Sequence, residues 1–424
     1  MTQPIRLLLI FLLLSTGLNT VAQTNAVPVY KGAVKASREK MYTNIVKNII
    51  TKNLFLPLSD STEENWESAF DAIEVLRYTP YWISETANAA FDGIEKRSPA
   101  FQRALLEFCY AMYPDSFTAP VETLASTTGN SKIFALCTEY LYQAKKINTS
   151  SIATKTRMFQ FMLEQDSILN PLVKSKWKLR DQDKIAALQE ISNPNFFPGN
   201  VVLISFQRKN RNYPGIVVVR DKAGNFITND SGKIIALPQL ARSVSNLPFY
   251  LTNGNTPQGV FRMFDFGQSK SMAIGPTTNI QLMMPLETSP QFFLKDSSIT
   301  DTVWTEVLYQ KILPESWKKY LPALETYYAS KAGRTEIIAH GTTVDPEYYK
   351  GQSYYPHTPT QGCLCTKEIW STADGSRLIS DQQQLVDAVQ KAGGPDGYVV
   401  VIEIDNQQKP VNLNDIWPYL KRKP

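Results

Sequence analysis

Histidine and cysteine are both scarce in this chain of 424 residues. It has two histidines, His340 and His357, and four cysteines, Cys109, Cys137, Cys363 and Cys365. Imidazole and thiol chemistry is therefore confined to these positions. Cys363, Cys365, His357 and His340 could supply four zinc ligands, but a single Cys-x-Cys without a second paired motif is a weak zinc signal. We therefore expect no metal ion and no other cofactor.

The sequence also lacks blocks of lysine and arginine. Its net charge of +5 is dispersed along the chain, whereas nucleic-acid-binding proteins gather basic residues on one face. No glycine-rich loop leads from a predicted strand into a helix, as a phosphate-binding loop requires. We therefore expect neither nucleic acid nor nucleotide as a partner. The slight positive excess would suit an acidic polymer or an anionic membrane surface.

Long hydrophobic runs are missing as well. The apolar run Leu7–Leu14 is far shorter than the ~20 residues that span a bilayer. Arg6 precedes it, and the small-residue sequence Thr20-Val21-Ala22 follows. This pattern predicts an export signal over residues 1–22, cleaved after Ala22, with an uncleaved anchor as the weaker interpretation. We therefore expect a protein of the periplasm or cell envelope, without a membrane span after cleavage.

Residues 25–192 have helical periodicity. Apolar residues recur at helical spacing in Trp66–Leu76, Ala100–Met112 and Lys132–Tyr142. Between these segments lie the breakers Thr79-Pro80, Tyr113-Pro114, Ala119-Pro120 and Thr128-Gly129. We predict an all-α domain of short helical hairpins over residues 25–192, without a fixed repeat. A protein partner would fit such a module.

Cys109 and Cys137 fall within two of these predicted helices, each among apolar residues. In an oxidising compartment they could form a disulfide between helices. Buried free cysteine is nevertheless common in protein cores, and sequence alone does not establish the Cα separation that a disulfide needs. We favour two buried thiols.

The periodicity changes after residue 195. Strands are predicted at Val201–Phe206, Gly215–Arg220, Phe249–Thr252, Gly259–Met263, Ile337–His340 and Tyr398–Ile404, and a helix at Asp381–Lys391. We therefore predict a β-rich domain over residues 196–408, followed by a tail at 409–424. The fold class is α+β.

Histidine and cysteine come close together in this second domain. Glu336-Ile337-Ile338-Ala339-His340-Gly341-Thr342 precedes Thr360-Gln361-Gly362-Cys363 by a short segment. A thiol becomes a useful nucleophile when a neighbouring imidazole accepts its proton. The pairing favours acyl transfer through Cys363, with His340 as the base.

These residues resemble the signature of the L,D-transpeptidase catalytic domain, the YkuD family of bacterial cell-wall enzymes. That signature is His-Gly in one strand, followed by Ser or Thr, usually His, then Gly-Cys. A second family motif, Thr-Pro-x-Gly-x-Phe, appears as Thr256-Pro257-Gln258-Gly259-Val260-Phe261. The resemblance covers roughly residues 200–406. It implies a mixed β-sandwich that acts on the stem peptides of peptidoglycan.

The resemblance also implies roles for particular residues. Cys363 would attack the peptide carbonyl, His340 would act as base, and backbone N–H groups around Gly362 and Cys363 would bind the oxyanion. Six further residues would line the substrate site: Gly341, Thr342, Tyr355, His357, Thr360 and Gln361.

Two positions depart from the family pattern. Gln361 stands where the family usually has histidine, and it cannot act as a base. His357 could partly replace that imidazole, although a histidine in such a loop is more often simply exposed. Cys365 stands where the family usually has arginine or asparagine, so substrate carboxylate binding needs another cation. Cys365 would either fill space beside the pocket or form a strained, reversible disulfide with Cys363.

Three functions are consistent with these residues. The first is an exported transpeptidase that cross-links or tethers peptidoglycan. The second is a hydrolase of the same fold that trims stem peptides, and the third is a wall-binding protein whose cysteine has lost its catalytic role. Gln361 and Cys365 favour the third, whereas the retained His340, Gly341, Gly362 and Cys363 oppose it.

Overall fold

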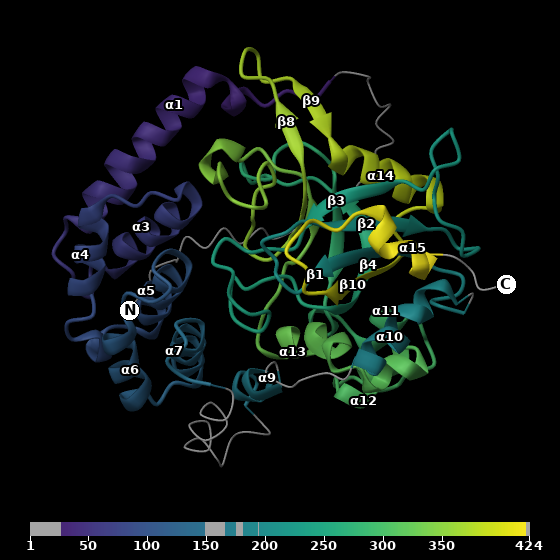
Figure 1. The fold of residues 1–424 in the computed structure, drawn as a ribbon, viewed down its shortest axis with the longest axis horizontal. Coiled ribbons are helices and arrows are strands. Elements are labelled where there is room, and N and C mark those ends of the chain that lie inside the picture. The colour runs from purple at the N-terminus through teal and green to yellow at the C-terminus, as the bar shows by residue number, and fades with distance from the viewer. Residues whose placement is uncertain (1–26, 149–165, 175–180, 194, 421–424) are drawn as a thin grey trace.

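The chain has a helical N-terminal region and a strand-rich C-terminal region (Figure 1). The computed structural model describes residues 27–148, 166–174, 181–193 and 195–420. The predicted export signal at residues 1–22 lies outside them. Within the described residues, no helix is long and apolar enough to cross a membrane.

The helical region begins with one continuous helix, which comprises α1 (Lys35–Asn44), a π-helical stretch at Ile45–Thr51 and α2 (Lys52–Leu54). Five helices follow: α3 (Glu63–Leu76), α4 (Tyr81–Ala89), α5 (Pro99–Met112), α6 (Thr118–Thr127) and α7 (Ser131–Gln143). Farther along lie α9 (Leu169–Lys174) and α10 (Asp181–Gln189). Side-chain caps begin two of the predicted helices, because Ser98 accepts the N–H of Phe101 and Asn130 accepts that of Ile133.

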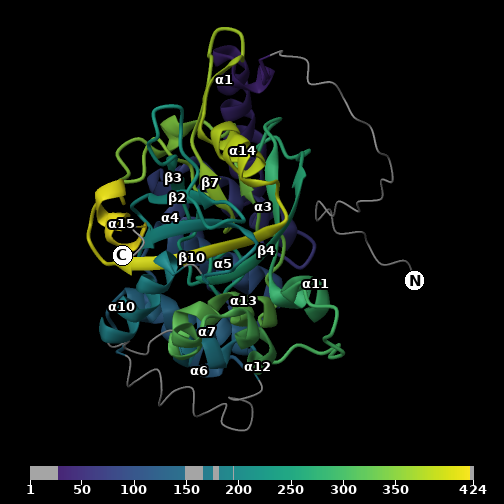
Figure 2. The same cartoon turned by 90° about the vertical axis from the view of Figure 1, so that its right-hand side faces the viewer.

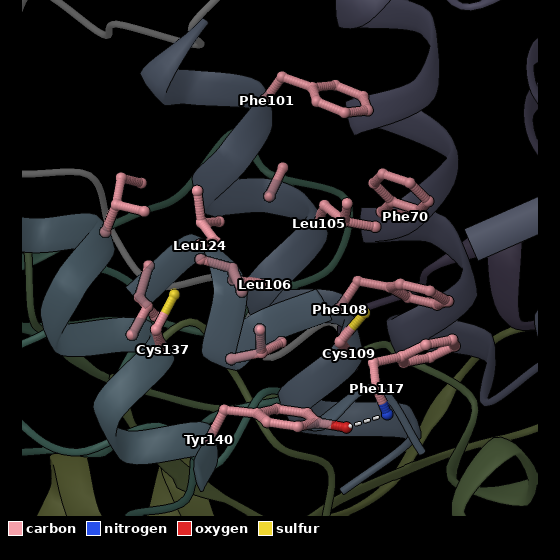
Figure 3. Packing of buried hydrophobic residues seen from close by; sticks show 14 of the residues in the cluster. Phe70, Phe101, Leu105, Leu106, Phe108, Cys109, Phe117, Leu124, Cys137 and Tyr140 are labelled. Carbon is pink, nitrogen blue, oxygen red and sulfur yellow. Dashed lines mark hydrogen bonds between the residues drawn. The ribbon is translucent and has the colours of Figure 1, made fainter. Parts of the chain in front are cut away.

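Apolar faces of α3, α5, α6 and α7 meet in one core (Figure 3). Phe70 stacks on Phe108 with ring centroids 4.7 Å apart, and the Tyr140 hydroxyl accepts the N–H of Phe117 at 2.8 Å. Cys109 and Cys137 belong to this core as fully buried free thiols. The structure therefore agrees with the interpretation of two buried thiols.

Within the described residues, the C-terminal region contains ten strands. They are β1 (Val201–Arg208), β2 (Gly215–Arg220), β3 (Ala236–Leu240), β4 (Gly259–Gly267), β5 (Asn279–Met283), β6 (Ala339–His340), β7 (Leu364–Thr366), β8 (Glu368–Trp370), β9 (Arg377–Ser380) and β10 (Gly397–Asp405). The structure does not confirm the expected sandwich. Strands β1-β10-β4-β5-β6-β7-β3-β2 pair in a closed barrel, and β8 pairs with β9 separately.

Helices cover both faces of the central strands. The helices of this region are α11 (Pro290–Leu294), α12 (Glu306–Tyr309), α13 (Glu325–Lys331), α14 (Asp381–Ala392) and α15 (Leu413–Leu420). Alternate residues of β1 and β10 enter two cores, one shared with α14 and the other with α13 and α15. Accordingly, α14 lies on one side of β10 and α13 on the other (Figure 2). Burial on both faces explains why these strands read as continuous apolar runs.

Two local predictions were wrong. Phe249–Thr252 is a turn, because Tyr250 and Leu251 are buried in the core of the helical region instead of in a sheet. Ala119-Pro120 does not break a helix but lies in the first turn of α6, where proline is tolerated because that N–H needs no intrahelical acceptor.

Candidate active site

Strand pairing brings the His-Gly and Gly-Cys segments together. β6 runs parallel to β7, with Ala339 opposite Leu364 and His340 opposite Cys365. The N–H of Leu364 also donates to the carbonyl of Ile338 at 3.0 Å, which extends the pairing toward Cys363. Side chains two residues apart on a strand share a face. Cys363 lies just before β7, two residues from the partner of His340, so continuing this register would make His340 and Cys363 diagonal neighbours.

The upstream Thr-Pro-x-Gly-x-Phe motif reaches the same place. The Thr256 hydroxyl donates to the carbonyl of Gly362 at 2.9 Å, across a sequence separation of 106 residues. Thr360 holds the turn from the other side, because its hydroxyl donates to the carbonyl of Cys363 and accepts the N–H of Gly362, both at 3.0 Å. Thr256 and Thr360 thus fix the backbone at Gly362 and Cys363.

Glycine is required at two positions of this site. Gly362 has a φ of 113°, and a Cβ there would lie 2.1 Å from Arg334 Nη2 and 2.6 Å from the carbonyl oxygen of Gly254. At Gly341 a Cβ would lie 2.3 Å from Oε2 of the buried Glu368, which accepts the N–H of Thr342 at 3.1 Å. Neither position has room for a side chain.

The Cys363 thiol is partly exposed at this turn. Its Sγ accepts the N–H of Ile338 at 3.5 Å and lies 3.7 Å from the carbonyl oxygen of Glu336. Burial raises the pKa of Cys363 to about 11, while the Ile338 N–H and the Arg334 charge oppose that rise. The thiol is therefore neutral near pH 7.

His340 is buried and uncharged. Burial lowers its pKa to about 4, and its Nδ1 contacts the carbonyl oxygen of Gly341. Because a carbonyl only accepts hydrogen bonds, Nδ1 carries the proton and Nε2 keeps a lone pair that can accept another. In the described part of the chain, no hydrogen bond joins His340 to Cys363.

The remaining predicted site residues divide into two groups. Gln361 and Tyr355 are exposed, with the Tyr355 hydroxyl donating to Glu347 at 2.8 Å. Thr342 and His357 belong to the segment that joins β6 to β7, and both are buried. Neither ring nitrogen of His357 has a hydrogen-bond partner in the described residues, and burial lowers its pKa to about 4. His357 is thus not the exposed loop histidine that its sequence context favours.

Cys365 is a buried free thiol, with its Sγ 3.9 Å from the Thr358 hydroxyl. It lies opposite His340 in the strand pair and is buried, whereas Cys363 two residues earlier is partly exposed. Among the described residues, no group of three or more His, Cys, Asp or Glu side chains is arranged to hold a metal ion.

Two residues of the site gave no sequence signal. Glu368 holds the turn at Gly341 and Thr342, and Arg334 packs behind Gly362. Both lie outside the recognised motifs, so only the fold brings them to the site. Glu336 is unusual in a different way, because its φ of 61° lies in the left-handed region.

Comparison of the chain with protein-family models, with curated proteins and with solved structures gives no match.

Proposed function

We propose that the protein is an exported cysteine L,D-transpeptidase that acts on the stem peptides of peptidoglycan. One observation supports this most: the Thr256 motif and the His340 motif both meet the segment that carries Cys363, although the three motifs are separate in sequence. Their meeting point is the arrangement that the resemblance to L,D-transpeptidases calls for. We also propose that the strand-rich region is related to the mixed sandwich of that family, and that its closed strand order is a variant of that fold.

The reaction begins at the carbonyl carbon between the diaminopimelate-type residue and D-Ala of a tetrapeptide stem. The sulfur of Cys363 forms a bond to this carbon while its proton passes to Nε2 of His340. The carbon–nitrogen bond then breaks, and the proton goes to the departing D-Ala amine. A thioester on Cys363 results. An amine of a second stem attacks the thioester and regenerates the thiol.

Proton transfer requires His340 and Cys363 to come closer than they lie in the free protein. Diagonal neighbours on paired strands are about 7–8 Å apart, a distance that the short cysteine side chain does not bridge without a movement or a water. Catalytic hydrogen bonds are often long in free enzymes and shorten in the substrate complex, or they pass through one water.

The oxyanion would accept a hydrogen bond from the Cys363 N–H. This N–H has no acceptor within the described residues, whereas the N–H of Gly362 already donates to Thr360. A backbone donor fixed in this way lowers the barrier without reorganisation during the reaction.

Product analysis separates this proposal from hydrolysis by the same site. The protein is incubated with purified disaccharide tetrapeptides, with and without an added tripeptide acceptor, and the products are read by mass spectrometry. We expect cross-linked dimers that have lost one D-Ala. Tripeptides alone would indicate a carboxypeptidase, because water would then be the acceptor. Cys363→Ala should form neither product, and Cys365→Ala serves as the matched control.

A non-catalytic wall-binding protein is the second candidate. It is favoured by Gln361 at the usual histidine position and by the lack of a hydrogen bond between His340 and Cys363 in the described residues. Cosedimentation with insoluble peptidoglycan, combined with no product from any stem peptide, would support it over the enzyme.

A further inference from the structure

Arg334 is a buried cation whose hydrogen bonds go to backbone carbonyl groups. The residue is only 6% exposed. Nη1 donates to the carbonyl oxygens of Asn255, at 2.7 Å, and Phe249, and Nη2 donates to that of Gly254 at 2.8 Å. It forms no salt bridge with any described carboxylate. Carbonyl groups satisfy its hydrogen bonds but leave its positive charge without a full counter-charge.

This charge lies directly behind the nucleophile. The hypothetical Cβ of Gly362, the residue before Cys363, would lie 2.1 Å from Arg334 Nη2. Cys363 and Arg334 each influence the pKa of the other, downward for the thiol and upward for the guanidinium. Burying an unpaired guanidinium costs free energy, so its position beside a thiol indicates a function.

The helical region holds Arg334 in place. The accepting carbonyls belong to the segment Phe249–Asn255, and the Tyr250 hydroxyl of that segment donates to the buried Glu139 of α7 at 2.7 Å. Tyr250 and Leu251 lie in the helical core. The guanidinium is therefore fixed by a segment that is itself anchored in the helices.

We propose that Arg334 is a positioning residue that stabilises the thiolate of Cys363 through its fixed positive charge. The inference rests on the proposed role of Cys363 as nucleophile, but not on the identity of the substrate. A cation close to a thiol favours the thiolate because the attraction is lost when the sulfur is protonated.

Other charged groups act on the same pair. Glu336 and Glu287 raise the pKa of Cys363, and their carboxylates therefore oppose Arg334. Glu107 and Glu287 raise the pKa of Arg334, and Arg334 in turn lowers the pKa of the nearby Lys132. Removing the charge of Arg334 should therefore raise the pKa of the Cys363 thiol, and removing the charge of Glu336 should lower it.

The test is the pH dependence of alkylation of Cys363 by iodoacetamide in the intact protein, read by peptide mapping. Mapping separates Cys363 from the three other thiols, which are buried. Arg334→Gln should raise the thiol pKa by about 1, and alkylation at pH 8 should become about tenfold slower. Arg334→Lys keeps the charge and should stay within about threefold of the wild type. Glu336→Gln should accelerate alkylation.

The outcomes discriminate clearly. Equal alkylation profiles for the wild type and Arg334→Gln would overturn the proposal. An equal fall in the alkylation rate of Arg334→Lys and Arg334→Gln, with unchanged thermal unfolding, would also overturn it. The hydrogen-bonding geometry of Arg334, and not its charge, would then matter. The alkylation assay uses no stem peptide, so it tests the role of Arg334 even if the protein is not a transpeptidase. Likewise, a negative alkylation result would not count against the transpeptidase proposal.

Discussion

The imidazole of His340 and the thiol of Cys363 have pKa values of about 4 and about 11, both shifted by burial. Each group is therefore neutral at pH 7, and the resting site is not an ion pair. In the proposed reaction the proton must leave the thiol as the sulfur attacks. The neutral imidazole is the form that can accept it.

The pH profile follows from these values. Protonated His340 cannot act as a base, so the rate of acylation should stay level from pH 8 down to about pH 5.5 and fall through pH 4. Stopped-flow or quenched mass spectrometry with a stem peptide measures this rate. A fall centred on the ordinary histidine pKa, near 6.5, would contradict the buried neutral state.

Variants assign the base, because the pKa of His357 is also lowered to about 4. His340→Ala should lower the acylation rate by roughly 10²-fold or more, the usual contribution of general base catalysis. His357→Ala should lower the acylation rate by a smaller factor, since the His357 ring has no hydrogen-bond partner among the described residues. A larger loss at His357 would reverse the assignment.

Gly362 offers a test of the local geometry. Gly362→Ala combines a φ of 113° with a Cβ 2.6 Å from a backbone carbonyl oxygen, so it should destabilise the protein by roughly 3 kcal/mol and abolish acylation. Gly351→Ala is the matched control: its φ is 87°, but no atom lies within 4 Å of the added Cβ. Gly351→Ala should lower the free energy of unfolding by about 1 kcal/mol. Urea unfolding compares the two, and equal losses would mean that the close approach at Gly362 is unimportant.

At the residue scale, the sequence pointed to the His340 and Cys363 segments, which lie side by side in the structure, but not to the residues around them. His340, Cys363 and Thr256 are found from motif spacing, because the motifs lie on paired or adjoining segments. Arg334 and Glu368 cannot be found in this way, since their roles depend on the close approach of Gly362 and Gly341. The burial of His357 was also unpredictable, because it depends on how the segment between β6 and β7 folds back.

At the scale of elements, long periodic segments were predicted best. The predicted helices at α3, α5 and α14 and the predicted strands at β1, β2 and β10 agree with the structure to within a few residues. Their patterns satisfy local propensity and burial together. The strand prediction at Phe249–Thr252 was wrong because the apolar residues of this turn pack against helices. Periodicity does not distinguish such a buried turn from a short strand.

Helices α3 and α5 carry buried glutamates, Glu74 and Glu107, that make the stability of the fold depend on pH. Burial raises the pKa of Glu107 to about 7 and that of Glu74 as well. A carboxyl with a raised folded-state pKa binds its proton more tightly in the folded protein, so stability is highest below the unfolded pKa, 4.5, and falls as the pH rises toward 7.

Glu107→Gln should weaken this pH dependence. Between pH 5 and pH 8, the wild type should lose on the order of 2 kcal/mol more of its free energy of unfolding than the variant does. Urea unfolding at a series of pH values provides the comparison. Identical slopes in the two proteins would show that Glu107 does not titrate in this range.

At the scale of the whole molecule, the helical half and the strand-rich half are joined at several places. Tyr250 donates to Glu139 at 2.7 Å, and Arg38 of α1 pairs with Asp345 at 2.5 Å. Residues before α1 also pair with the β8–β9 hairpin, where the N–H of Tyr30 donates to Gly375 at 2.8 Å. The helices thus brace the segments that carry the site, a role that composition and periodicity did not reveal.

The most direct test of the account is the mass of the protein after brief incubation with a purified tetrapeptide muropeptide. We predict a covalent adduct equal to the muropeptide without its terminal D-Ala, located on the peptide that contains Cys363. The adduct should form in Cys365→Ala and be absent from Cys363→Ala. A folded wild-type protein that forms no adduct with any stem peptide, or a Cys363→Ala variant that retains turnover, would contradict the proposed function.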